Sequence, residues 1–329
     1  MSSALLGARR ITRLLLVGVL FCGALSASAG PALTEIRGPV SAQALTPAQR
    51  LRIGVGGCSL FPGDNAWNTR IDTAPLRAGS ALTIEEIRTT GANFLHPDFG
   101  ENPTYGIPFV VVPATQPLVP IIYTGARDES DPGPFPIPLN VPIESGSDRH
   151  VLVVQQGACR LYELYAAVRV GGGFSAYSGA TFDLGSNALR PLGFTSADAA
   201  GLAILPGMVR YDEVATGTIS HAIRVTFNIT QRAYIAPATH FASSSINTDA
   251  PPMGLRLRLK SSFDINTLSG QARVIATAFQ RYGLIVADNG SNWFFQGAPD
   301  PGWNDAELDQ LKAIPGSAFE VVDTGPTLR

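Results

Sequence analysis

The chain has 329 residues, of which 45% are apolar and 15% are charged, and it contains 34 glycines and 25 prolines. This length and apolar fraction allow a sizeable buried core and exclude wholesale disorder. Twenty-four basic and 26 acidic residues give a formal net charge of −2, which argues against polyanion binding, so we expect no nucleic-acid partner. Three cysteines are too few for a disulfide-dense scaffold.

The first 29 residues have the pattern of a secretory signal peptide. Arg9, Arg10 and Arg13 precede an apolar run over residues 14–25, and the small residues of a cleavage site end at Ala29. About a dozen apolar residues are fewer than the roughly 20 that a membrane span needs. We therefore expect a secreted protein without a membrane span, in which residues 1–29 are the signal peptide, 30–57 a flexible leader and 58–329 one β-rich domain.

Export leaves Cys58 and Cys159 as the two cysteines of the mature chain. Two cysteines in an oxidising compartment commonly pair, so a disulfide is predicted, with two buried thiols as the alternative. The bond would tie the segment after Gly57 to a strand about 100 residues further along the chain, which constrains the unfolded state.

The first elements of the domain are expected to be short. A helix is predicted over residues 81–90, and apolar, β-branched runs bounded by proline predict strands at 107–112 and 118–123. Residues 127–147 are rich in proline, glycine and acidic side chains and predict an ordered loop.

The clearest local signal is an alternating run on each side of a Gly-Ala turn, which predicts a β-hairpin over residues 149–169. In this register His150 lies opposite Tyr165, with Glu163 diagonal to His150 on the same mixed face. A mixed face suits a sheet surface open to solvent or to a ligand. The other face is more uniformly apolar and is expected to face the core: Val151, Val153, Tyr162 and Leu164.

A second alternating run covers residues 219–229, and an extended segment that ends at His240 follows it. An even-length turn between the two would place His221 opposite His240, whereas a three-residue loop would break this pairing. Pro237 cannot donate to a ladder, so the second strand is expected at an edge or at a bulge.

The remaining elements are a strand at 254–260, a helix at 269–282, a hairpin of 284–287 with 291–295, a helix at 304–312 and a strand at 319–322. Strands dominate this pattern and helices are short. The predicted fold is mainly β, a jelly-roll-like antiparallel β-sandwich with a few short peripheral helices. The helix and strand near residues 270–287 fit it least well, so an α+β fold is the alternative.

Two groups of side chains could carry chemistry. In the first hairpin His150, Glu163 and Tyr165 could transfer protons, while Asp148 or Arg149 at the strand start could hold the substrate. A histidine stacked on a tyrosine beside a solvated glutamate is the alternative interpretation.

The second group combines Glu213 with His221 and His240, and Asp212 could bind a polar substrate. A helix cap or a surface turn is the alternative for this acidic pair. A divalent metal at His221 and His240 would need a third ligand that no local spacing supplies, so no metal and no cofactor is expected.

Other side chains are open to two interpretations. Asp198 resembles the carboxylate of a helix N-terminus more than a catalyst. Glu129 and Asp131 could line a cleft or remain in water. Trp67, Trp293 and Trp303 could stack on sugar rings if they are exposed, although tryptophan is more often buried.

Several phrases together resemble a family of exported proteins found in bacteria and in some fungi: FPGDNAWNT at 61–69, DRHVLVV at 148–154, SADAAGL at 196–202, RYDEV at 210–214, HAIR at 221–224 and YGLIVADNG at 282–290. The resemblance covers roughly residues 58–323. Members are sometimes attached to carbohydrate-binding or immunoglobulin-like modules, so it implies an extracellular, polymer-directed role. It transfers no catalytic residue, because no function is established for the family.

Export, a β-sandwich and acid, histidine and tyrosine side chains on one sheet face favour a secreted enzyme. We expect it to act on an extracellular polysaccharide or oligosaccharide, as a hydrolase or a lyase, by acid/base catalysis from a sheet-face cleft. A non-catalytic carbohydrate-binding protein or a structural envelope protein is the alternative.

Overall fold

The computed structural model describes residues 54–329, and the predicted signal peptide and residues 30–53 of the predicted leader lie outside this part. Residues 54–57 were also assigned to the flexible leader, and this was wrong. Val55 is buried and forms a β-bridge with Cys58, so these residues belong to the folded unit.

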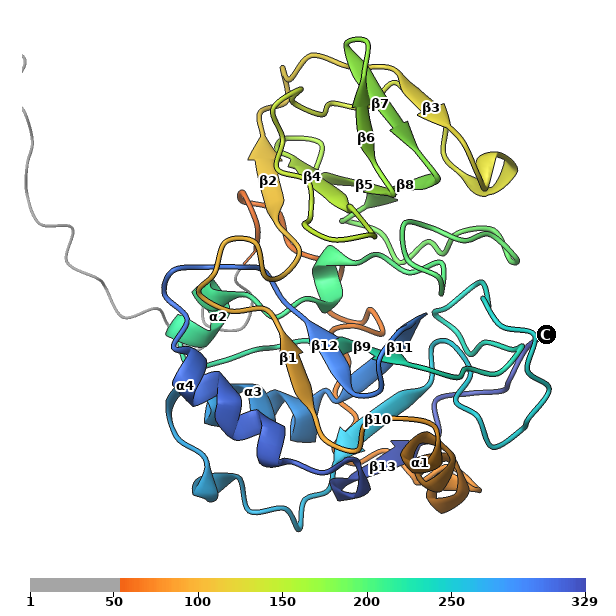
Figure 1. Cartoon of the computed structure of the whole chain (residues 1–329), viewed down its shortest axis with the longest axis vertical. Coiled ribbons are helices and arrows are strands. Elements are labelled where there is room, and N and C mark those ends of the chain that lie inside the picture. The colour runs from red at the N-terminus through yellow and green to blue at the C-terminus, as the bar shows by residue number, and fades with distance from the viewer. Residues whose placement is uncertain (1–53) are drawn as a thin grey trace, which may run out of the picture. The chain divides into compact units, whose positions relative to one another are not determined.

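Six strands form the largest sheet, in the order β1-β12-β9-β11-β10-β13 (Figure 1). Their bounds are β1 His96–Asp98, β12 Phe294–Gln296, β9 Ile223–Phe227, β11 Leu284–Asn289, β10 Arg256–Leu259 and β13 Phe319–Val322. The neighbours β9 and β11 run parallel, as do β1 and β12, and the other pairs are antiparallel.

Two smaller sheets lie together above the six-stranded sheet in Figure 1. One has the order β2-β4-β5-β8 and the other β3-β7-β6. The bounds are β2 Phe109–Val112, β3 Ile121–Tyr123, β4 Val151–Gln155, β5 Arg160–Tyr165, β6 Val168–Val170, β7 Gly173–Ala176 and β8 Ser178–Asp183.

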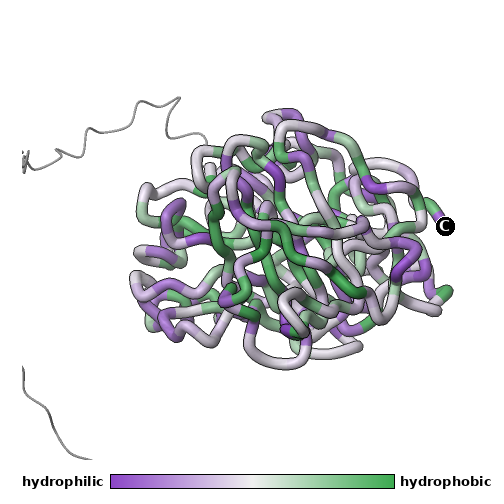
Figure 2. Tube along the Cα trace, turned by 90° about the horizontal axis from the view of Figure 1, so that it is seen from above, coloured by the Kyte–Doolittle hydropathy of each residue, from purple (hydrophilic) through white to green (hydrophobic). Residues whose placement is uncertain are grey.

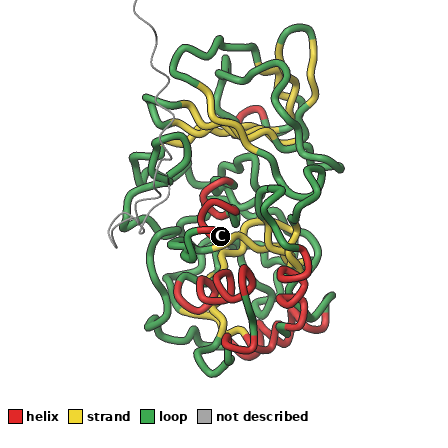
Figure 3. The backbone as a smooth tube through the Cα atoms, turned by 90° about the vertical axis from the view of Figure 1, so that its left-hand side faces the viewer, coloured by secondary structure: helices red, strands yellow, loops and turns green. Residues whose placement is uncertain are grey.

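The α-helices are short and belong to the larger sheet's part of the unit. They are α1 Ser80–Thr89, α2 Tyr211–Ala215, α3 Gly270–Arg281 and α4 Asp305–Leu308. Figure 3 shows the helices gathered around this part, whereas the smaller sheets are joined mostly by loops. Asn304 caps α4 as its sequence predicts, because its side chain accepts the backbone N–H groups of Ala306 and Glu307.

The prediction of a mainly β fold with short peripheral helices is confirmed for residues 54–329, where 13 strands form these three sheets. The sheets are mixed rather than purely antiparallel. The parallel pairs are β1–β12, β9–β11, β2–β4 and β3–β7, each joining strands that are not consecutive along the chain.

The hairpin β4–β5 has the predicted register, with Val151 opposite Leu164 and Gln155 opposite Arg160. Most of its mixed face is not open to solvent, because Leu152, Val154 and Leu161 are buried in the main core and Glu163 is fully buried. Only the end of this face, with His150 and Tyr165, lines pockets. The opposite face packs into a second, smaller core against the three-stranded sheet, so the hairpin is covered on both sides.

The predicted pairing of His221 with His240 does not form. The strand β9 begins only at Ile223, and its two neighbours are β11 and β12. Both edges of β9 are therefore occupied, and the chain after Phe227 runs as loop until β10. For the same reason the predicted hairpin of 284–287 with 291–295 is wrong, because β11 and β12 flank β9 on opposite sides.

Large apolar side chains fill the space between the sheets. Figure 2 shows hydrophobic segments running through the interior and hydrophilic ones mostly at the outer loops. Trp67, Trp293 and Trp303 are all at most 3% exposed, so they are core residues and cannot stack on sugar rings.

The predicted disulfide between Cys58 and Cys159 is confirmed, and it joins residues 101 positions apart. Cys58 lies in the main core beside the turn of the β4–β5 hairpin. The bond therefore fastens the start of the described chain to the four-stranded sheet.

Replacing both cysteines by serine should lower the free energy of unfolding by about 3–5 kcal/mol, because a loop of this length removes much unfolded-state entropy. Urea denaturation of the oxidised protein and of the Cys58→Ser/Cys159→Ser variant measures the difference. A change below about 1 kcal/mol would contradict this account of the bond.

Candidate functional site

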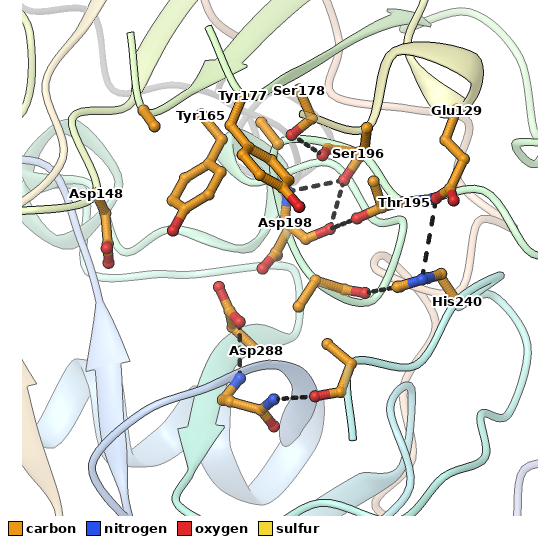
Figure 4. A pocket seen from close by; sticks show the side chains of 16 residues that line it. Glu129, Asp148, Tyr165, Tyr177, Ser178, Thr195, Ser196, Asp198, His240 and Asp288 are labelled. Carbon is orange, nitrogen blue, oxygen red and sulfur yellow. Dashed lines mark hydrogen bonds and ion pairs between the residues drawn. The ribbon is translucent and has the colours of Figure 1, made fainter. Parts of the chain in front are cut away.

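A pocket of about 500 Å³ opens where the ends of β5 and β8 approach the end of β11. Two loops, residues 195–199 and 240–242, complete its wall. Figure 4 shows that the polar side chains come from both the smaller and the larger sheet. Those that matter for chemistry are Glu129, Asp148, Tyr165, Tyr177, Asp198, His240 and Asp288.

Asp198, which lies at the floor of this pocket, belongs to a buried ion pair. The Arg224 guanidinium donates to both carboxylate oxygens of Asp198, with Nη2 to Oδ1 at 2.7 Å and Nε to Oδ2 at 3.3 Å. Arg224 Nη1 donates to Gln296 Oε1 at 2.7 Å. The Asp198 side chain has no exposed area, and that of Arg224 has 3%. Paired and hydrogen-bonded, both charges can remain in the interior.

Asp288 is the second carboxyl group of the floor. Its Oδ2 lies 4.0 Å from Arg224 Nη2, and its side chain keeps 27% of its area exposed. In Figure 4 the carboxyl groups of Asp198 and Asp288 point toward one another and into the pocket. A bulge in the pairing of β11 with β9 between Val286 and Asp288 redirects the end of the strand.

Burial and the negative charge of Asp198 together raise the pKa of Asp288 to about 7, although Arg224 partly offsets both effects. Its carboxyl group therefore exchanges a proton near neutral pH. The neighbouring Asp198 is instead held in an ion pair. Two carboxyl groups in different environments are the arrangement that lets one act as an acid and the other as a base or nucleophile.

Two tyrosines form an aromatic wall. The rings of Tyr165 and Tyr177 are 5.8 Å apart and nearly perpendicular, and Tyr177 is 49% exposed. Burial and the nearby charge of Asp148 raise the pKa of Tyr165, so its hydroxyl remains a hydrogen-bond donor. Figure 4 shows this hydroxyl directed toward the space in front of Asp198 and Asp288.

The opposite wall carries Glu129 and His240. His240 Nδ1 donates to the backbone oxygen of Ala199 at 2.7 Å, and its Nε2 lies 3.9 Å from Glu129 Oε2 (Figure 4). Glu129 in turn accepts the backbone N–H of Thr195 at 3.0 Å. His240 is thus oriented by its backbone contact, with its other ring nitrogen facing a carboxylate.

His150 lines a second pocket of about 280 Å³ beside the first. Its Nδ1 lies 2.5 Å from Glu144 Oε2 and its Nε2 3.2 Å from the backbone oxygen of Ala197. Burial alone would lower the pKa of His150, but the hydrogen bond and charge of Glu144 outweigh it and the pKa is raised. Both ring nitrogens are therefore engaged, and His150 is a fixed charged group rather than a free base.

Glu163, predicted to share an accessible face with His150, is fully buried and lines neither pocket. Its carboxylate accepts the backbone N–H groups of Ile204 and Leu205 at 2.9–3.0 Å. Burial raises the pKa of Glu163 to about 7, although these hydrogen bonds oppose the rise. Glu163 therefore holds the backbone at residues 204 and 205 in place.

The second predicted group is divided. His221 Nε2 lies 3.0 Å from Glu213 Oε2, so this pair forms as expected, but it is buried at α2 with Arg210 and lines neither pocket. Asp212 lies beside it and contacts Arg210. His240, by contrast, belongs to the first pocket.

The predicted substrate-binding residues at the start of the first hairpin also separate. Asp148 lines both pockets, whereas Arg149 lines neither. The Arg149 Nε is buried without a hydrogen-bond partner among the described residues. The structure thus brings together Asp148, His150, Tyr165 and His240 around the two pockets.

No group of three histidine, cysteine, aspartate or glutamate side chains within residues 54–329 is arranged to hold a metal ion. His221 and His240 have different partners and do not form the metal pair that was considered. In the same part of the chain, each helix is too short or too polar to cross a lipid bilayer.

Asp198, Arg224, Asp288 and Glu144 were not recognised from the sequence as functional residues. Arg224 carried a usable signal, because every residue of β9 is buried and an arginine inside such a strand needs a buried partner. Asp198 and Asp288 lie 26 and 64 residues away from it along the chain. Only the tertiary structure shows that they share one guanidinium.

No family model, curated protein or solved structure matches this chain. The resemblance to exported proteins of bacteria and fungi therefore stays a prediction. The functional assignment rests on the residues and geometry of the site.

Replacing Asp198 by asparagine should lower the pKa of Asp288. The variant loses the negative charge that raises this pKa and frees Arg224 to interact with Asp288. Carboxyl ¹³C NMR titration of both proteins measures the shift, with the exposed Asp183→Asn as a control. An unchanged or higher pKa would show that the charges are not coupled.

Glu163 should make the fold less stable as pH rises. Its pKa in the folded protein, about 7, exceeds the ordinary 4.5, so the folded state binds this proton more tightly. The group then costs about 3 kcal/mol by the time the pH has risen from about 4.5 to 7. Relative to the wild type, Glu163→Gln should show a correspondingly smaller fall in urea stability over this range, and an identical fall would refute the assignment.

Proposed function

We propose that the protein is a secreted enzyme that cleaves an extracellular glycan by acid/base chemistry, with Asp198 and Asp288 as its catalytic carboxyl pair. The observation that carries this proposal is that two carboxyl groups on one pocket floor have different environments. Asp198 is held by the Arg224 guanidinium, whereas Asp288 retains its proton up to a pKa of about 7. A carboxyl pair that cleaves glycans needs one protonated and one ionised group, which different environments provide.

In this proposal Asp288 in its protonated form donates to the oxygen of the leaving sugar. Asp198, which is held by Arg224 and has no exposed side-chain area, stabilises the developing positive charge of the sugar ring electrostatically, and the attacking water gives its proton to the Asp288 carboxylate. The hydroxyl of Tyr165 is a hydrogen-bond donor to the sugar. In a lyase a base would remove the proton from the carbon next to the carboxyl group, a C=C bond would form, and the C–O bond would break as the leaving oxygen is protonated, so the unsaturated product distinguishes this reaction from hydrolysis.

The choice of a glycan as substrate rests on the wall and on the compartment. The half-exposed ring of Tyr177 and the ring of Tyr165 can pack against the apolar faces of sugars, while carboxylates and hydroxyls bind their hydroxyl groups. The disulfide Cys58–Cys159 fits an oxidising environment outside the cytoplasm, in agreement with the signal-peptide pattern.

His150 and Glu163 take supporting roles in this proposal. Glu144 and a backbone oxygen occupy both ring nitrogens of His150, and Glu163 lies beneath the pocket. Both are positioning residues, because neither presents a free atom to a substrate.

Non-catalytic carbohydrate binding is the second candidate, and the exposure of Tyr177 at the pocket wall favours it. Binding alone, however, does not require a buried arginine that holds one carboxylate next to a second carboxyl group of raised pKa. Catalysis and binding alone predict different effects of the carboxyl variants.

On a polysaccharide that the wild type cleaves, Asp288→Asn and Asp198→Asn should each lower kcat by about 100-fold or more, because positioned acid/base groups contribute that much. Asp212→Asn is a matched control, since this carboxyl lies outside both pockets. The assay is the release of reducing ends or of unsaturated uronates from a panel of neutral, amino and acidic polysaccharides.

The wild-type rate should also fall as pH rises above about 7, because Asp288 must keep its proton to act as an acid. If no polysaccharide in the panel released a product, an enzyme of this class would be contradicted. Equal rates for wild type and Asp288→Asn would remove the carboxyl pair from the mechanism and favour another site.

A further inference from the structure

The two pockets adjoin and share part of their walls. Asp148, Asp288 and Asn289 line both of them, so these three residues form the boundary between the two spaces. The floor also continues from one pocket to the other, because Asp198 of the first pocket is ion-paired with Arg224 of the second at 2.7 Å. Asp288 thus lies between two cavities rather than at the closed end of one.

The cavities differ in character. The larger carries the rings of Tyr165 and Tyr177, and the smaller, about 280 Å³, is lined mostly by polar groups such as Asp98, Glu144 and Gln296. A single sugar ring in either cavity would leave the other empty. An acid at the boundary is the position expected for a bond that joins two occupied subsites.

Acidic side chains prevail in the two cavities taken together. Arg224 is paired with Asp198 and His150 with Glu144, so three further acidic side chains, Glu129, Asp148 and Asp98, stand against one further histidine, His240. Arg149, which was predicted to hold the substrate, lines neither cavity. Acidic sugars would meet carboxylates of the same charge at close range, which is unfavourable.

From this geometry we infer that the substrate is a chain of uncharged or amino sugars that occupies both cavities, with the scissile bond at Asp288, so that cleavage occurs inside the chain. The inference rests on the proposed function and adds the substrate class and the position of the cut. The first cavity binds the unit on one side of the bond, and the second cavity binds the unit on the other side.

Isothermal titration calorimetry at pH 6 with the Asp288→Asn variant, which prevents turnover, tests the two subsites. The probes are monomers and tetramers of glucose, xylose, N-acetylglucosamine, glucosamine and galacturonate. At least one uncharged or amino tetramer should bind about tenfold or more tightly than its monomer, and the galacturonate tetramer should bind more weakly than it. Absence of tetramer binding, or tightest binding of galacturonate, overturns the inference.

Filling the second cavity tests where the extra units bind. Ser291 is exposed and lines only that cavity, so Ser291→Trp in the same background should reduce tetramer affinity about tenfold and leave monomer affinity unchanged. Ser262→Trp, at an exposed serine that lines neither cavity, is the control. Equal tetramer affinity in both tryptophan variants would overturn the second subsite.

Product analysis separates this inference from the proposed function. If tetramers bind more tightly than monomers but the wild type cleaves none of them, the proposed enzyme function is contradicted and the two-cavity inference is not. Cleavage that releases only single terminal units contradicts the two-cavity chain and leaves the carboxyl pair in place. Internal cuts, with oligomers as the first products, support both.

Discussion

The buried ion pair between Arg224 and Asp198 is the interaction on which the site depends. Arg224 comes from the six-stranded sheet, whereas Asp198 comes from the loop after the last strand of the four-stranded sheet. Moving two charges out of water costs several kcal/mol per ion, and their attraction offsets this only when the geometry and the remaining hydrogen bonds are good, so the contact constrains how the two elements can approach. Because Asp198 takes the closest contacts of the guanidinium, Arg224 lies 4.0 Å from Asp288 and only partly offsets the rise in its pKa.

The same constraint explains why the buried polar groups concentrate where the two parts meet. Glu163 satisfies the backbone N–H groups of residues 204 and 205, and Glu144 satisfies His150. Because these side chains are engaged with the protein, the groups that can reach a substrate are those on the floor of the first pocket and the Tyr165 hydroxyl. A rigid support beneath a few accessible atoms is what precise proton transfer requires.

Local patterns in the sequence were sufficient for much of the fold. Alternation around a Gly-Ala turn predicted the register of β4 and β5, because a slip of one residue would have moved every side chain to the other face. Two cysteines predicted the disulfide, and Asn304 predicted a helix start. Tertiary pairings were not accessible in this way: β9 pairs with β11 and β12, which follow it by about 60 and about 70 residues, and this excludes the His221–His240 hairpin. The carboxyl pair was missed for the same reason, whereas Asp148, Tyr165 and His240 were named because strand ends and rings gave local signals.

The central claim is that Asp288 keeps a proton near neutrality because it is buried and lies beside the carboxylate of Asp198, which is bound by arginine. Carboxyl ¹³C NMR of the wild type, with Asp288 assigned by comparison with Asp288→Asn, measures this directly. The account predicts a titration midpoint near 7 for that carboxyl. A midpoint near the ordinary value of an aspartate, about 3.9, would contradict it.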